Sequence, residues 1–343
     1  MTHGERECEF PFPYLLFYAI IIDDIILPVY SVDGLGGGGM GMQLFFQNLI
    51  GGLQMGSIYA LIALGYTMVY GIVRLINFAH GDIMMVGSYA VFWIGTTTAI
   101  TAFSQANPLL AALCMVLFSV LFCVTLGVLI DRVAYTPLRN APRISALITA
   151  IGISLALQII VQLLFGSGQI KFPALVPAVS LFKVGRKPVT LLELLTLLVS
   201  LSLMVALQLI VRKTRVGKAM RAVSEDKDAA RLMGVNINHT ISITFAIGSA
   251  LAAIGAIFYA QKVIYIKPFL GSMPGLKAFV AAVLGGIGVI PGAVLGGFII
   301  GISETYIKYY AGEYVDAMVF GILIVVLLVK PSGLLGKKTR EKV

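Results

Sequence analysis

Long apolar stretches separated by short polar segments run through the chain from residue 44 onward. A bilayer core of about 30 Å needs about 20 apolar residues per helix. The pattern therefore predicts an all-α fold, a polytopic transmembrane helical bundle of about 8–9 spans with broken or re-entrant helices. The expected spans are residues 44–70, 83–103, 109–130, 144–166, 190–211, 240–261, 276–290, 292–309 and 314–330.

Composition supports this prediction and excludes a soluble fold. The chain has 59% hydrophobic and 12% charged residues, whereas soluble domains carry about 25% charged residues. The net charge of +9 does not indicate nucleic-acid binding, because the basic residues cluster at the ends of apolar segments. By the positive-inside rule, residues 212–231 and the basic tail 336–343 are expected in the cytoplasm, and the loop 166–190 outside.

Glycines and a proline break the segment 276–309 repeatedly. Small residues allow helix backbones to approach closely in lipid, so one interpretation is tight structural packing. The other is a broken hairpin that lines a translocation path, and both can hold together. The path candidates in this segment are Gly285, Gly286 and Pro291.

A second break, at residues 74–82, places Asn77, His80 and Asp82 between apolar arms. It is either an ordinary inner loop or a re-entrant turn whose polar side chains face a water-filled cavity, so these three residues are also path candidates. Asp82 is alternatively a cap for the following helix. His80 has no partner residues at ligand spacing, so no metal site is expected.

The charged segment 212–238 separates two apolar stretches. Ser224 followed by acidic residues predicts a helix start, and Gly234 predicts its end, so residues 225–233 are expected to form one short helix. It is either a solvated loop helix or a docking helix for a cytoplasmic protein. The residues expected to couple to such a partner are Arg221, Ala222, Glu225, Asp226, Ala229, Ala230 and Gly234.

Residues 1–41 differ from the rest of the chain. Their apolar part holds three prolines and the adjacent Asp23 and Asp24, which would be costly within a bilayer. We interpret them as an atypical N-terminal extension, with Met40 or Met42 as a candidate true start. Residues 42–335 then form the membrane domain.

Two blocks carry a family resemblance. GGLQMGSIYALIALGYTMVYGIVRLINFAHGDIMMVGSYA (Gly51–Ala90) and KAFVAAVLGGIGVIPGAVLGGFIIGISE (Lys277–Glu304) resemble the permeases of branched-chain amino acid ABC transporters. Glu225, the alanine pair at 229–230 and Gly234 are similar to a relaxed form of the cytoplasmic EAA loop of ABC importer permeases. The resemblance covers about residues 42–335.

The resemblance implies a permease subunit of an importer in a bacterial or archaeal inner membrane. Its expected partners are two cytoplasmic ABC ATPases, a second homologous permease and an extracytoplasmic binding protein that delivers the amino acid. The chain has no phosphate-binding loop of the Walker type and no catalytic constellation, so we expect no bound cofactor, with ATP hydrolysed by the partners.

Three rival functions stay open. Related permeases take up urea, short amides or other amino acids. A secondary transporter or channel would need intramembrane acids, for which Glu193, Glu304 and Asp316 are the candidates. A membrane-embedded enzyme is disfavoured by the missing catalytic residues.

Overall fold

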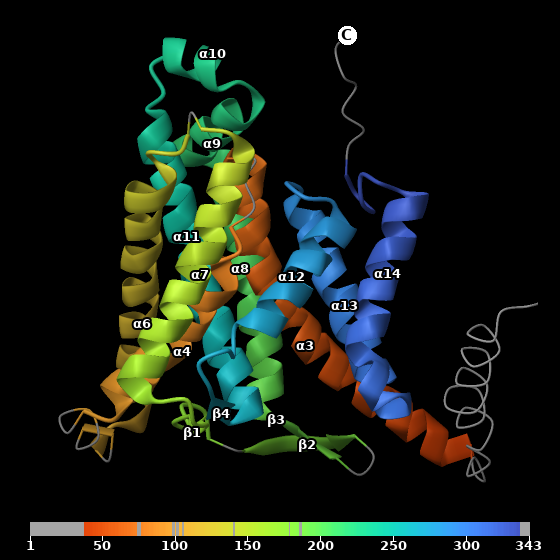
Figure 1. The fold of residues 1–343 in the computed structure, drawn as a ribbon. Coiled ribbons are helices and arrows are strands. Elements are labelled where there is room, and N and C mark those ends of the chain that lie inside the picture. Colours follow the sequence, from red (N-terminus) through yellow and green to blue (C-terminus); the bar gives the residue numbers. More distant parts are fainter. Residues whose placement is uncertain are drawn as a thin grey trace, which may run out of the picture.

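A computed structural model describes residues 38–73, 77–97, 100, 103–104, 106–139, 141–177, 179–184 and 187–336 (Figure 1). Helices dominate this part of the chain, which confirms the predicted class. The principal helices are α3 (Gly38–Val73), α4 (His80–Gly95), α6 (Pro108–Ile130), α7 (Arg143–Phe165), α8 (Leu191–Lys213), α9 (Arg215–Glu225), α10 (Lys227–Leu232), α11 (Ile237–Val263), α12 (Ser272–Gly285), α13 (Ile290–Tyr310) and α14 (Val315–Val329).

Seven helical segments in the described part are long and apolar enough to cross a membrane. They contain α3, α6, α7, α8, α11, α13 and α14. The two remaining predicted spans, 83–103 and 276–290, are the short helices α4 and α12, of 16 and 14 residues. At 1.5 Å per residue these helices are about 24 and 21 Å long, so each is too short for a core of about 30 Å.

The two ends of the bundle differ (Figure 1). One end, which we call the α9–α10 end, carries those two helices and the last turn of α14. The opposite end carries two small antiparallel pairs, β1 (Ile170–Lys171) with β4 (Tyr265–Ile266) and β2 (Ser180–Val184) with β3 (Lys187–Thr190). The loop 166–190 therefore lies opposite the charged segment 212–238, as the charge pattern predicted.

Both chain termini lie largely outside the described residues. The predicted N-terminal extension falls mostly in residues 1–37, and the described part of α3 begins at Gly38. Most of the basic tail falls in residues 337–343. The extension, the tail and the candidate start sites at Met40 and Met42 stay predictions.

Helix α3 forms the centre of the bundle and packs closely against α13. A Cβ atom added at Gly297 would lie 2.6 Å from the Ala60 Cα, and one at Gly301 would lie 2.1 Å from the Gly56 nitrogen. These contacts require glycine on α13 because the two backbones touch. The close-packing interpretation of the glycine-rich segment is therefore confirmed.

Helices α4 and α12 meet at their N-termini inside the bundle. A Cβ at Gly81 would lie 2.6 Å from the Gly271 carbonyl oxygen, and one at Gly271 would lie 1.9 Å from the Gly81 oxygen. From this contact α4 runs toward the strand-bearing end and α12 toward the α9–α10 end (Figure 1). Each helix therefore covers part of the bilayer, which matches the discontinuous helices that line substrate paths in transporters.

Candidate functional site

A buried carboxylate lies beside the meeting point of the two short helices. Asp82, in the first turn of α4, is 2% exposed. Ser154 donates a hydrogen bond to one of its oxygens, and Gln158 Nε2 donates to the other at 2.8 Å. Ser154 is the middle residue of the full-length span α7, so Asp82 lies near the centre of the bilayer.

Asp82 borders a pocket of about 300 Å³ between α3, α4, α7 and α12. This volume lies at the lower end of the range of about 300–1,000 Å³ for small-molecule sites. A few polar groups converge in it among apolar and aromatic side chains, and Gln158 Nε2 also lies 3.2 Å from Ser272 Oγ. The lining residues are Tyr66, Phe78, Gly81, Asp82, Ile151, Ser154, Leu155, Gln158, Gly271, Ser272, Leu276 and Phe279.

The structure separates the path candidates into three places. Asn77 and His80 are buried beside the pocket without lining it: Tyr135 donates to Asn77 Oδ1 at 2.9 Å, and the His80 ring packs on Tyr66. Only Asp82 reaches the pocket. It does not cap α4, because the N-cap position is Ala79 and makes no side-chain bond, so the capping alternative is wrong.

Gly285, Gly286 and Pro291 lie at the turn between α12 and α13, away from the pocket. A Cβ at Gly285 would lie 1.8 Å from the Gly292 oxygen. Gly286 has φ +106° and packs against the backbone of Gly336. These glycines serve close backbone contacts at the α9–α10 end of the bundle.

The charged segment forms two helices where the sequence predicted one. Asp226 interrupts the segment in extended conformation and accepts hydrogen bonds from the backbone of Asp228 and Ala229. Asp226, rather than Ser224, is therefore the N-cap of α10, since its carboxylate reaches two free amides. Helix α10 ends at Leu232, and Gly234 just beyond it has φ +82°, so the stop signal predicted at this glycine is confirmed.

The docking face on α10 differs from the predicted one, because the structure buries one predicted residue and exposes two others. Ala230 is 4% exposed and packs into the protein's own core, so it is not available to a partner. Leu232 and Met233 are instead 89% and 84% exposed beside it. The other predicted coupling residues are exposed on α9 and α10, namely Arg221, Ala222, Glu225, Asp226, Ala229 and, after α10, Gly234.

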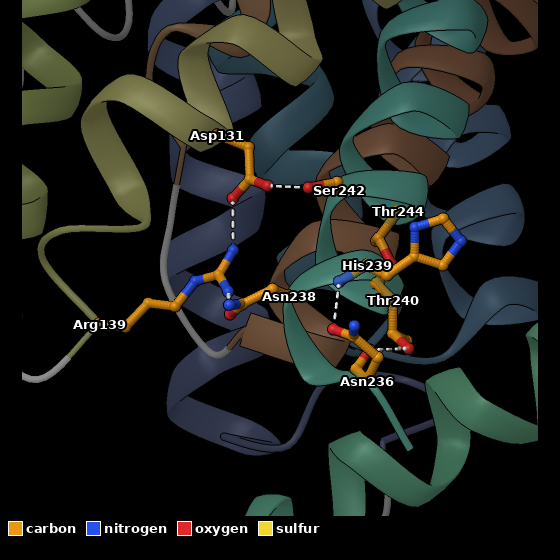
Figure 2. A network of polar contacts seen from close by, with 8 residues as sticks. All are labelled: Asp131, Arg139, Asn236, Asn238, His239, Thr240, Ser242 and Thr244. Atoms are coloured by element: carbon orange, nitrogen blue, oxygen red, sulfur yellow. Dashed lines mark hydrogen bonds and ion pairs between the residues drawn. The ribbon is translucent and has the colours of Figure 1, made fainter. Parts of the chain in front are cut away.

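A polar network holds this segment to the bundle (Figure 2). Asp131, fully buried at the end of α6, pairs with Arg139 at 2.9 Å and accepts a hydrogen bond from Ser242 of α11 at 2.5 Å. Arg139 also donates to Asn238 in the first turn of α11. The network therefore ties Asn238, at the end of the charged segment, to the end of α6 and to the next turn of α11.

Two functional features were missed by sequence reasoning, although each has a signal. Ser154 and Gln158 stand four residues apart in a largely apolar span, which puts both on one helix face. Helix α9 follows from Thr214, whose hydroxyl accepts from the Gly217 amide, and from the spacing of the buried Met220 and Val223. Both the polar pair on α7 and the start of α9 can therefore be recognised from the sequence alone.

The three acids considered for ion coupling all have structural partners. Glu193 forms a reciprocal capping box with Thr190 at the start of α8. Glu304 on α13 and Asp316 on α14 each pair with Lys277 of α12 at 2.8 Å. None of these acids lines the pocket beside Asp82.

The fold and the site define a polytopic membrane permease with a pocket, mainly apolar and aromatic with a few polar groups, where two short helices meet. The chain belongs to the family of permease components of branched-chain amino acid transport systems, whose model matches residues 48–328.

Curated relatives agree over most of the chain. The high-affinity branched-chain amino acid transport system permease protein BraD of Pseudomonas aeruginosa is 42% identical over 303 residues, which cover 87% of this chain and 98% of that protein. LivH of Escherichia coli K12, which carries the same description, is 43% identical over 305 residues with the same coverage. The probable branched-chain amino acid permease LivH of Methanocaldococcus jannaschii is 29% identical over 301 residues, 84% of this chain and 91% of that protein. No solved structure matches the chain.

Proposed function

We propose that the chain is the permease subunit of an ABC importer and carries branched-chain amino acids through the inner membrane. The observation that supports this most is the pocket at Asp82, which combines a buried carboxylate with apolar and aromatic walls near the middle of the bilayer. A branched-chain amino acid has matching chemistry, with charged groups at one end and an aliphatic group at the other. The named functions of BraD and LivH support the same substrate class.

The α9–α10 end is the proposed cytoplasmic docking site for two partner ATPases. Leu232 and Met233 present exposed apolar side chains at the end of α10, flanked by charged residues. Large apolar side chains anchor protein interfaces when they enter a pocket on the partner, while charges around them set the register. The network from Arg139 to Asp131 and α11 would then carry the movement of the ATPases into the membrane helices.

A second permease is proposed to cover the open side of the pocket, and an extracytoplasmic binding protein to deliver the substrate to the strand-bearing end. Leu155 and Leu276, on the α7 and α12 sides, are exposed at the mouth, and so is the polar Ser272. Polar groups and irregular backbone at membrane depth are tolerated where protein or a water-filled cavity covers them. A partner permease on this face would provide that cover and complete the path.

The test is leucine uptake by the complete complex, expressed with its ATPases and binding protein in cells that lack other leucine importers. We expect ATP-dependent accumulation of leucine, isoleucine and valine. The variant Leu232→Ala should reduce both uptake and co-purification of the ATPases. Leu163→Ala is the matched control, because Leu163 is 80% exposed at the strand-bearing end of α7. Accumulation of urea with no amino acid uptake would contradict the proposed substrate.

A further inference from the structure

Asp82 is a buried carboxylate without a cation. Its hydrogen-bond donors are the neutral side chains of Ser154 and Gln158. The ion pairs found in the described part of the chain involve Asp131, Glu304 and Asp316, and none includes Asp82. A buried charge is costly unless it is paired, and ionisable groups inside a membrane mark substrate and ion pathways.

The cation of the neighbouring helix is not available to Asp82. Lys277 on α12 is 7% exposed and is engaged by Glu304 and Asp316. Lys277 is also absent from the pocket lining, whereas Asp82 and Ser272 are present. The pocket therefore carries a negative group and neutral dipoles.

We propose that Asp82 is the subsite for the α-ammonium group of the transported amino acid. This inference rests on the proposed function and adds the residue and the charge that recognise the substrate. The ammonium group pairs with Asp82, which Ser154 and Gln158 hold in position through their hydrogen bonds. Phe78, Phe279 and Leu276 then offer apolar contacts to the branched side chain.

The other charged end of the substrate finds complementary groups across the same pocket. Gly271 and Ser272 stand at the start of α12, a helix of 14 residues whose positive dipole end lies at this place. The Ser272 amide donates to the Phe269 carbonyl oxygen and Pro274 has no amide hydrogen, so the helix dipole, rather than a set of free amides, supplies the positive potential. A zwitterion therefore meets negative charge on the α4 side and positive potential on the α12 side. Because the two helices touch at Gly81 and Gly271, any movement that separates them also separates the two halves of this site.

The test measures uptake of radiolabelled leucine by the complete complex for two substitutions at Asp82, with rates normalised to assembled complex. We expect Asp82→Asn to reduce uptake at least tenfold and to raise the KM for transport. Asp82→Glu should retain more activity, because it keeps the charge. A purely structural role predicts the reverse order, since asparagine preserves the size and the acceptor oxygen. Glu193→Gln is the control, because it makes the same chemical change in a capping box that accepts glutamine.

A second pair of variants tests the same idea without altering Asp82. Ser272 is exposed at the mouth, so Ser272→Lys would supply a tethered ammonium that competes with the substrate. We expect at least a tenfold loss of leucine uptake, whereas Ser272→Met, of similar length and uncharged, should lose much less. Equal uptake by the two variants would overturn the inference.

Two further outcomes are distinguishable. If the unaltered complex accumulates leucine and Asp82→Asn does so with the same KM and maximal rate, the ammonium subsite is wrong and the importer function stands. If the unaltered complex accumulates no amino acid, the proposed function fails and the subsite with it. Replacement of sodium by choline should not change uptake; loss of uptake would assign Asp82 to an inorganic cation instead.

Discussion

Two regions of the bundle hold largely buried carboxylates, Glu304 and Asp82, which differ in whether the protein supplies a counter-charge. Glu304 pairs with Lys277 at 2.8 Å and accepts a hydrogen bond from Tyr59 at 2.6 Å, so its charge is neutralised by the protein. Asp82 receives neutral hydrogen-bond donors only. The first arrangement joins α3, α12 and α13 and is self-sufficient. The second leaves the Asp82 carboxylate without a counter-charge from the protein, so a bound substrate can supply one.

This difference separates architecture from function. An ion pair that stays closed holds helices in register, and both of its members are needed for stability. A carboxylate kept without a partner reduces stability, and such a cost is expected at sites that bind a ligand. Lys277, Glu304 and Asp316 accordingly form a structural clamp on α12, whereas the Asp82 pocket is the proposed binding site.

The largest effect on stability is expected from opening the clamp. Lys277→Met would leave Glu304, whose side chain is only 13% exposed, without a counter-charge, and the loss of one partner costs about 3–5 kcal/mol in buried pairs. We expect the purified complex to lose thermal stability or fail to assemble. Asp82→Asn in the same assay should stay within about 1 kcal/mol of the parent or gain stability, because it removes an unpaired buried charge.

Lys267→Met is the control for the clamp, because Lys267 is an exposed lysine in the loop before α12. It should leave the melting temperature unchanged. If Lys277→Met were as stable as this control while Asp82→Asn unfolded the protein, the assignment of clamp and binding site would be reversed.

An intermediate effect is expected at the contact between α3 and α13, which positions the clamp. Gly297→Leu would force the helices apart at Ala60, next to Tyr59, and so weaken the bond from Tyr59 to Glu304. Overpacking of this kind costs about 1–3 kcal/mol, and more where backbones touch. Gly321→Leu on α14 is the matched control, because a Cβ there meets nothing within 4 Å. Similar thermal stability of the two variants would show that the contact has room for a side chain.

The sequence predicted the membrane bundle, the close-packed glycines and the helix stop at Gly234 because each depends on local pattern. It did not reveal which path candidates would meet. Asp82 and Gln158 are 76 residues apart, and their contact depends on how α4 packs against α7. The prediction that Ala230 faces a partner has the same weakness. The alanine lies in a charged segment, but tertiary packing that the local sequence does not specify buries it.

The split of the charged segment has a local cause that sequence reasoning weighed wrongly. Ser224 and Asp226 are both capping residues, and both precede acidic or polar positions. Ser224 lies inside α9, where its hydroxyl donates to the Arg221 carbonyl oxygen, so Asp226 begins the next helix. The choice follows from the burial of Met220 and Val223, which extends α9 through Ser224.

The smallest effect is expected at Asp316, the outer member of the clamp. Its side chain is 47% exposed, so water screens its attraction to Lys277, whereas Glu304 is 13% exposed and holds the same ammonium at the same distance. Exposed ion pairs contribute about 0–1 kcal/mol, so Asp316→Asn should lower stability by less than about 1 kcal/mol. Glu304→Gln should cost several times more, because it removes the buried partner and disturbs the bond from Tyr59. Thermal unfolding of the two purified variants side by side measures this ratio. Equal losses would mean that the two acids share Lys277 evenly and that burial does not rank the members of the clamp.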